Sequence, residues 1–239
     1  MIKIDFRRPE WTAAAAALAC GTLAHSFALF NSIHNYDDIL QQPTGYGAGI
    51  TLGRWLLTVL GDLNTKVLGL GYNLPMVNGV VFVFLIAMSA TLLVNVLRIS
   101  SRGSAILIGC LMSTFPTVCA AMAFRYVAPY FGISLLLSVV AAWSADRGKL
   151  GFPFSAICVA CSMGIYQAYV PVTIGIFLLM LMRDSLEEDV KFSRLVGKGF
   201  SYVGCLIFGV VLYFIGCIYS VGCSCRYGGT PSRACKITV

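Results

Sequence analysis

Two adjacent carboxylates in a long polar connection are the side chains of this sequence best suited to catalysis. Asp37 and Asp38 end the polar run of residues 31–38, directly after the first apolar segment. A carboxylate in such a place can act as general base on a hydroxyl, and its neighbour can orient the acceptor or bind a divalent cation through oxygen. Adjacent residues of an extended chain point to opposite sides, so we expect unequal roles for the two. A solvated loop or a helix cap is the alternative interpretation.

Cations and sugar-binding groups lie at the same expected membrane face. Arg54 and Arg125 are the cations best placed to hold a phosphate, because the planar guanidinium matches its oxygens; the alternative for each is an anchor at the membrane interface. Tyr166 and Gln167 offer an aromatic face and an amide, which suit sugar rings and hydroxyls. His34 is a further candidate base, or simply a polar loop residue.

Other reactive residue types favour structural interpretations. His25 lies inside the first apolar segment, and we interpret it as a packing residue whose polar atoms are satisfied within the bundle. Cys158 and Cys161 form a CxxC pair, but it lies within an apolar run and has no partner pair. We therefore predict no metal site there, since buried free cysteine behaves as a small hydrophobic residue.

The elements that position these residues follow from composition. Apolar residues make up 58% of the 239 residues and charged residues only 11%, against about 25% charged in soluble domains. A soluble domain of this size could not bury so much apolar surface. The composition excludes a soluble enzyme and predicts an all-α, polytopic transmembrane bundle.

We expect about seven membrane spans, since one span needs about 20 apolar residues. The clear ones are residues 11–30, 75–97, 104–124, 127–144 and 196–219. Residues 151–182 are too long for one upright span and are interrupted by Tyr166, Gln167 and Pro171, so we predict two short passes. Pro116 is expected to kink its helix. The positive-inside rule then predicts a cytoplasmic N-terminus, with residues 31–73 on the outer side.

The outer loop of residues 31–73 contains a predicted amphipathic helix. Residues of one apolar face recur at helical spacing; they are Leu52, Trp55, Leu56, Val59, Leu60, Leu63 and Val67. We expect this helix to lie in the membrane interface. It begins next to Arg54, so it would hold that cation near the headgroups.

Three motifs resemble those of a known enzyme family. Residues 32–38 (SIHNYDD), the Gly53–Arg54–Trp55 run and the Tyr166–Gln167–Ala168 turn resemble the Gtr-type O-antigen glucosyltransferases, polytopic enzymes of the GT-C superfamily. The similarity covers roughly residues 11–219. It implies a bacterial inner-membrane enzyme with its active loop on the periplasmic side. The implied catalytic acid is Asp37 or Asp38.

The resemblance also implies the partners. The donor would be a glucosyl polyprenyl phosphate and the acceptor a sugar hydroxyl of lipid-linked O-antigen, both held beside membrane lipid. No nucleic acid is expected as a partner, and the sequence leaves open a divalent cation as cofactor. The alternative function is a non-enzymatic lipid-sugar flippase or transporter.

The last residues differ in character from the rest. We expect residues 1–220 to form one transmembrane bundle and residues 221–239 an aberrant or disordered tail, because the tail contains three cysteines and no apolar periodicity. Members of the family are longer, so we expect a C-terminally truncated enzyme, active or inactive. A short outer tail with a disulfide is the alternative.

Overall fold

The structure is a computed structural model that describes residues 8–31, 36, 49–50, 52–69, 74–186 and 192–227. These residues form helices and connecting turns, and no strand occurs among them, which confirms the all-α class. The elements are α1 (Pro9–Phe30), α3 (Trp55–Asp62), the π-helical turn η1 (Leu63–Val67), α4 (Pro75–Val96), α5 (Arg102–Thr114), α6 (Pro116–Ala123), α7 (Ala128–Ala145), α8 (Gly148–Ile165), the 3₁₀ turn η2 (Gln167–Tyr169), α9 (Val170–Ser185) and α10 (Phe192–Tyr227).

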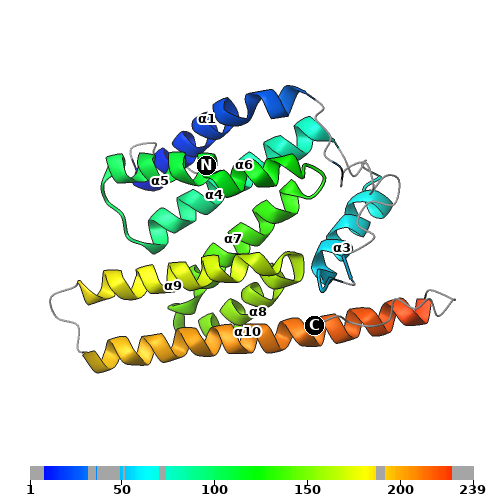
Figure 1. The fold of residues 1–239 in the computed structure, drawn as a ribbon. Coiled ribbons are helices and arrows are strands. Elements are labelled where there is room, and N and C mark those ends of the chain that lie inside the picture. Colours follow the sequence, from blue (N-terminus) through cyan, green and yellow to red (C-terminus); the bar gives the residue numbers. More distant parts are fainter. Residues whose placement is uncertain are drawn as a thin grey trace, which may run out of the picture.

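The helices form two groups that α7 joins (Figure 1). Helix α1 packs on α4 and α5 in the first group, and α8 packs on α10 in the second. Helix α7 runs between the groups and packs on both α4 and α8. Helix α3 lies at one end of the bundle, where it contacts α8 and α10. This position brings α3, the helix predicted within the outer loop, against the second group.

Six of the seven predicted spans are confirmed as helices long and apolar enough to cross a membrane, with approximately the predicted bounds. Within the described part of the chain, six helical stretches are long and apolar enough to cross a membrane, and α5 with α6 counts as one of them. A seventh, shorter apolar helix covers Leu150–Ile165. Residues 151–182 do form two passes, because α8 ends at Ile165 and α9 begins at Val170. The chain is therefore a multi-pass membrane protein.

Prolines mark where several of these helices begin. Pro9, Pro75, Pro116, Pro129 and Pro171 occupy the first or second position of their helices. Proline is favoured there because its fixed φ suits a helix and its missing N–H has no intrahelical partner in the first turn. The kink expected at Pro116 is confirmed as a break between α5 and α6.

Small residues allow the first group to pack closely. An ideal Cβ built on Gly109 of α5 would lie 3.0 Å from the backbone nitrogen of Ala17 in α1, so the two backbones nearly touch. Ala13, Ala17 and Ala105 are fully buried in the same cluster. Close approach through small residues is typical of helices that associate in lipid.

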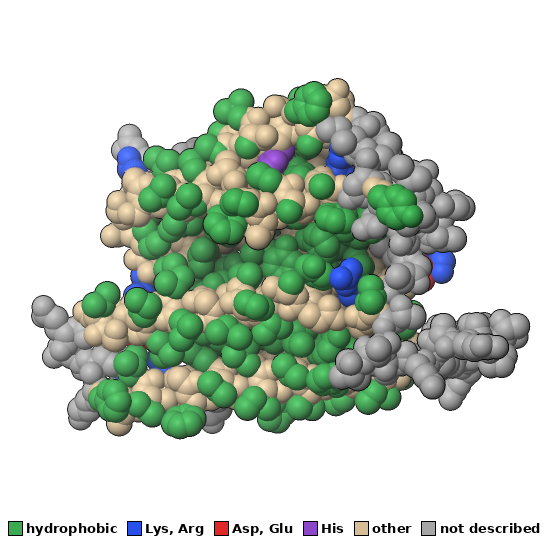
Figure 2. Space-filling model, viewed as in Figure 1, with side chains coloured by type: hydrophobic (Ala, Val, Ile, Leu, Met, Phe, Trp, Pro, Cys, Tyr) green, Lys and Arg blue, Asp and Glu red, His purple; other side chains and the backbone are tan. Residues whose placement is uncertain are grey.

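Large apolar side chains cover the outside of the bundle. Leu23 is 76% exposed, Phe200 74% and Ile218 68%. Figure 2 shows hydrophobic side chains over both helix groups and in the depression between them. Such a surface is stable in lipid and would aggregate in water.

One end of the bundle is held together by a group of charged side chains, of which Asp184 is buried. Lys198 of α10 donates to Asp146 and Asp184, with both N–O distances 2.7 Å, and Tyr202 donates to Asp146 at 2.8 Å. We call Asp146, Asp184, Lys198 and Tyr202 the ion cluster. Arg183 also pairs with Asp184 and donates to the carbonyl of Val96 at the end of α4. The ion cluster therefore joins α7, α9 and α10, and Arg183 extends it to α4.

Two features differ from the expectation: the buried face of α3 and the end of α10. The face of α3 that packs on the bundle holds Leu57, which is 3% exposed, and the partly buried Leu56 and Leu60, whereas Val59 and Leu63 of the predicted apolar face are about half exposed. The helix thus has apolar residues toward both the bundle and its surroundings. Helix α10 continues to Tyr227, seven residues into the predicted tail of 221–239, and the rest of that tail lies outside the described residues.

Candidate functional site

The chain entering α3 is anchored to the far half of the bundle by Gln167. The side-chain amide Nε2 of Gln167 donates to the carbonyl of Leu52 at 2.8 Å and to the hydroxyl of Tyr213 in α10 at 2.8 Å. Gln167 lies in η2, the turn between α8 and α9. The predicted Tyr166–Gln167 turn therefore joins three parts of the chain at one point.

Gly53 makes this close approach feasible. Its φ is +73°, in the left-handed region that favours glycine. A Cβ at this position would collide with the hydroxyl of Tyr213 and lie 3.1 Å from Nε2 of Gln167. The turn that precedes Arg54 thus needs glycine for its backbone conformation and for space.

Trp55 fixes α3 between two helices. A Cβ built on Gly164 of α8 or on Gly216 of α10 would lie 2.7 Å from the indole Cε2 of Trp55. The ring therefore fills a slot that two glycines leave open. Because the slot is formed by α8 and α10, the first turn of α3 is held at the end of the bundle where α8 ends.

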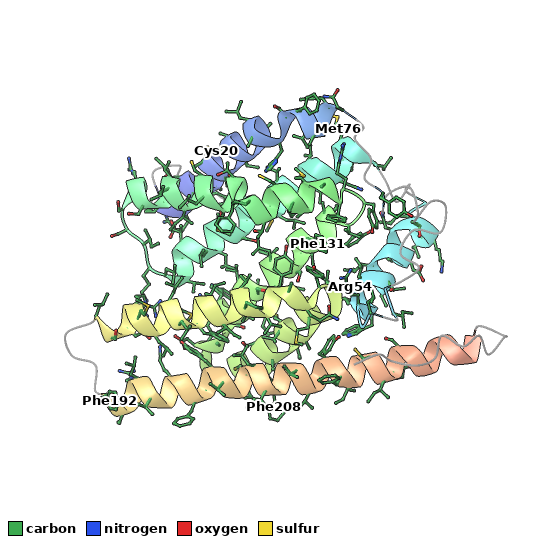
Figure 3. The ribbon with its side chains drawn as sticks, in the orientation of Figure 1. Cys20, Arg54, Met76, Phe131, Phe192 and Phe208 are labelled. Atoms are coloured by element: carbon green, nitrogen blue, oxygen red, sulfur yellow. The ribbon has the colours of Figure 1, made fainter. Side chains whose placement is uncertain are left out.

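Arg54 lies over an aromatic cluster at this end. Its guanidinium carbon is 4.5 Å from the ring centroid of Tyr166, a cation–π contact. Tyr166 in turn contacts Phe131 of α7, with ring centroids 4.9 Å apart, and Tyr169, with centroids 6.2 Å apart. Figure 3 shows Arg54 where the start of α3 meets the rest of the bundle, near Phe131. We call Arg54, Trp55, Phe131, Tyr166, Gln167 and Tyr213 the Arg54 site.

Two donors of the Arg54 site have no partner within the described residues. The Nε of Arg54 and the indole Nε1 of Trp55 are both buried and donate to no acceptor there. A buried N–H without an acceptor costs about 1–3 kcal/mol. The Nε1 of Trp55 lies within the slot between Gly164 and Gly216. Arg54 is a cation with an unpaired donor beside an aromatic face, an arrangement that suits an anionic ligand.

The structure separates Arg125 from the Arg54 site. Arg125 is 2% exposed, and its Nη1 donates to the carbonyls of Ala28 and Asn31 at 2.7 Å each. A cation at these carbonyls stabilises the C-terminal end of α1. Arg125 therefore holds the residue from which the outer loop departs, and its predicted role in phosphate binding stays a prediction.

Three of the predicted site residues lie outside the described residues. These are Asp37, Asp38 and His34. Within the part of the chain that the structure describes, no group of three or more His, Cys, Asp or Glu side chains could hold a metal ion. The two aspartates and a divalent cation on them therefore stay predictions.

The structure also assigns residues that sequence reasoning did not single out. Tyr213 and Phe131 belong to the Arg54 site but lie within long apolar runs, where nothing distinguishes them from other packing aromatics. Gly164 and Gly216 give no signal in one sequence either. The interpretation of His25 is confirmed: it is 5% exposed, and its Nε2 lies 2.9 Å from the carbonyl oxygen of Ser113.

Comparison with known proteins identifies the family. The family described as "Glucosyl transferase GtrII" matches residues 26–236. The matched range contains the outer loop, the whole Arg54 site and most of residues 221–239. No curated protein and no solved structure is significantly similar to the chain. The match covers most of the sequence, so the chain belongs to the GtrII glucosyltransferase family.

Proposed function

We propose that this glucosyltransferase moves glucose from a polyprenyl phosphate donor to a hydroxyl of lipid-linked O-antigen, at the periplasmic face of the bacterial inner membrane. Family membership supports glucosyl transfer as the activity. The multi-pass bundle supports a donor and an acceptor that are themselves held in the membrane. A lipid carrier would bring the sugar to the interface where α3 lies.

The partly buried cation Arg54 is the observation on which this proposal depends most. A departing polyprenyl phosphate carries negative charge, and a fixed guanidinium can stabilise that charge as it develops. Arg54 is held in place by the ring of Tyr166 and keeps its Nε without an acceptor among the described residues. The arrangement supports Arg54 as the ligand of the donor phosphate.

The remaining groups of the Arg54 site suit the sugar. Tyr166 is partly exposed, and its ring is an aromatic surface against which a pyranose ring can pack. Gln167 already donates to Leu52 and Tyr213. We therefore propose that Gln167 positions the chain before Arg54, that Trp55 fixes the start of α3, and that Tyr166 contacts the glucose.

The proposed reaction needs one base and one leaving group. The acceptor oxygen attacks C1 of glucose and the C1–O bond to phosphate breaks, so that polyprenyl phosphate leaves with the bonding electrons. Asp37 or Asp38 takes the proton of the acceptor hydroxyl. Arg125 supports this placement indirectly, because it holds Asn31 just before the loop that carries both aspartates.

Charge distribution supports the orientation. Among the described residues, the helix ends and connections opposite the Arg54 site carry many basic residues. These are Arg98, Arg102, Arg147, Arg183, Arg194 and Lys198. Basic residues concentrate in cytoplasmic connections. The Arg54 site would then face the periplasm, where the positive-inside rule also places the outer loop.

Donor kinetics in membranes that carry the chain test the role of Arg54. Arg54→Gln should lower kcat/KM for polyprenyl phosphate-glucose about 10- to 100-fold, because a charge-assisted hydrogen bond contributes about 1.5–3 kcal/mol. Arg54→Lys should recover part of this loss, since the charge remains but the planar fork does not. Lys66→Gln is the matched control, because Lys66 is an exposed cation in η1 that pairs with Asp62. Unchanged kinetics in Arg54→Gln would refute the assignment.

A further inference from the structure

A large groove lies at the end of the bundle opposite the Arg54 site. It has a volume of about 870 Å³, with α4 as its floor and α1 and α7 as its walls. Small side chains on the wall of α1 leave it open, since Ala14 and Ala15 line it and Leu18 follows one turn later. Ala87 on α4 deepens the floor. The groove is open on the outer surface of the bundle, where large apolar residues are exposed.

Each of the three helices contributes a stripe along the groove. On α4 the stripe runs from Phe84 through Met88 to Asn95, and on α7 it runs from Leu136 through Trp143 to Arg147. The eleven steps from Phe84 to Asn95 correspond to about 16 Å of helix, at about 1.5 Å per residue. One leaflet is about half of the ~30 Å hydrocarbon core. The groove therefore has the length of a single leaflet.

The polarity of all three stripes changes at the same end. The start of α1 contributes Arg8, Glu10 and Trp11, and the end of α7 contributes Trp143 and Arg147. The guanidinium of Arg147 stacks on Trp143 at 3.6 Å from the ring centroid. Tryptophan and arginine at one level are typical of the headgroup region of a membrane. The apolar part of the groove thus ends where headgroups would lie.

A second, polar hollow of about 270 Å³ continues from this end. It shares Asn95, Trp143 and Arg147 with the groove and adds Arg98 and Arg183. Together the two hollows form an apolar groove that ends in a polar pocket, which we call the head pocket. This is the shape that a lipid with a compact headgroup requires.

The charge of the head pocket favours an anion. Arg8, Arg98, Arg147 and Arg183 line the two hollows, against Glu10 and Asp146. Asp146 is neutralised by Lys198 in the ion cluster, and Arg183 pairs with Asp184. Arg147 forms no ion pair with any described residue, since its contact is the ring of Trp143. After these pairs are removed, the cations Arg8 and Arg147 face the single carboxylate of Glu10.

We propose that this groove binds an anionic glycerophospholipid, with one acyl chain along α4 and the headgroup phosphate at Arg147. The glycerol and ester groups would lie at the level of Trp11 and Trp143, and Arg8 would face the phosphate from α1. This is a lipid site at the membrane end remote from the glucosyl transfer, and it stands whether or not the proposed donor and acceptor are correct.

Tryptophan quenching by brominated lipids tests the site in the full chain. The sequence has three tryptophans, so Trp11→Phe with Trp55→Phe leaves Trp143 as the single reporter. The protein is placed in bilayers of phosphatidylcholine that contain equal mole fractions of either brominated phosphatidylglycerol or brominated phosphatidylcholine. The proposal predicts that the phosphatidylglycerol probe quenches Trp143 several times more effectively, because it concentrates in the groove.

Three further variants distinguish lipid binding in the groove from general attraction of anionic lipid to a basic surface. Arg147→Gln should reduce the preference for phosphatidylglycerol about fivefold, since one arginine near anionic lipid contributes about that factor. Ala15→Phe should reduce quenching by filling the groove from an exposed position without disturbing the core. Arg194→Gln removes an exposed cation at the same end that does not line the groove, and it should leave the preference unchanged.

Several outcomes would overturn the proposal. Equal quenching by the two probes would mean that a lipid tail enters the groove without headgroup recognition. An unchanged preference in Arg147→Gln would remove the assigned phosphate ligand. An equal loss in Arg194→Gln would show a diffuse basic surface instead of a site.

Discussion

Arg54 and Trp55 are neighbours in sequence, yet their side chains contact different parts of the bundle. Arg54 lies on Tyr166 at the end of α8, whereas Trp55 fits between Gly164 and Gly216. The cation is therefore held by residues on both sides: by the anchored turn before it and by the wedged indole after it. The side chain of Arg54 is thus held in place before a ligand binds, which reduces the entropic cost of ordering it on binding.

Gln167 is the residue whose loss should release this arrangement. Gln167→Met keeps the length of the side chain but removes its donations to Leu52 and Tyr213. We expect the donor KM to rise about 3- to 10-fold, because each lost neutral hydrogen bond costs about 0.5–1.5 kcal/mol. Thr65→Val is the control, since Thr65 bonds only to Gly61 of its own helical segment. Equal KM values for Gln167→Met and the unmodified chain would contradict the anchoring role.

Some of the site residues could be predicted from the sequence, and some could not. Residue type and position suggested Arg54, Tyr166 and Gln167, and the structure brings these three together. The same reasoning selected Arg125, but sequence does not reveal that the last carbonyls of α1 lie within its reach. Whether an arginine is satisfied by carbonyls of its own chain depends on contacts between segments far apart in the sequence. Such contacts cannot be read from a single sequence.

At the scale of elements, the prediction succeeded where length and proline decide. The spans follow from apolar runs, and their starts follow from proline in the first turn. The face of α3 was harder to predict, because apolar residues on two sides of that helix serve the bundle and its surroundings differently. The contact of Trp55 with Gly216 joins residues far apart in the sequence, so no local pattern could reveal it.

The slot for Trp55 gives a direct test of element packing. Gly164→Ala or Gly216→Ala places a methyl group about 2.7 Å from the indole ring, and overpacking of this kind costs about 1–3 kcal/mol. Each variant should lower both thermal stability in detergent and transfer activity. Gly175→Ala in α9 is the matched control, because no atom lies within 4 Å of its added Cβ. Equal melting temperatures for all three variants would mean that α3 is not wedged as described.

The ion cluster should stabilise the other end of the bundle. Lys198→Met leaves Asp184, which is 5% exposed, with Arg183 as its remaining partner. We expect a loss of about 1–3 kcal/mol in the free energy of unfolding, because the buried Asp184 loses one of its charge-assisted hydrogen bonds. Lys66→Met breaks a pair in which Lys66 and Asp62 are 71% and 50% exposed, and should change stability by less than about 0.5 kcal/mol. The free energy of unfolding is measured by denaturant titration in micelles. Similar losses in the two variants would show that the ion cluster does not stabilise the bundle.

At the scale of the whole molecule, the two ends of the bundle differ in chemistry. One end holds the aromatic Arg54 site beside the outer loop, and the other holds the ion cluster and a majority of basic residues. Helix α7 connects them, because Phe131 near its start belongs to the first end and Asp146, directly after its last residue, belongs to the second. This polarity predicts a fixed orientation in the membrane.

Epitope insertion in the full chain tests that orientation. A tag inserted after Gly69 should be accessible to antibody in intact spheroplasts, because that connection lies at the end of the Arg54 site. A tag inserted after Leu186 should become accessible only after permeabilisation, because it lies at the basic end. The reverse pattern would place the Arg54 site in the cytoplasm and exclude the proposed periplasmic transfer.

The most direct test of the account measures transfer of labelled glucose from polyprenyl phosphate-glucose to lipid-linked O-antigen by membranes that carry the chain. The unmodified chain should transfer glucose, and one of Asp37→Asn and Asp38→Asn should lose at least 100-fold in rate, since general-base catalysis contributes about 10²–10⁴-fold. The other variant should keep most of the activity, because we expect unequal roles for the pair. Transfer that survives both substitutions at the full rate would contradict the outer loop as the source of the catalytic base.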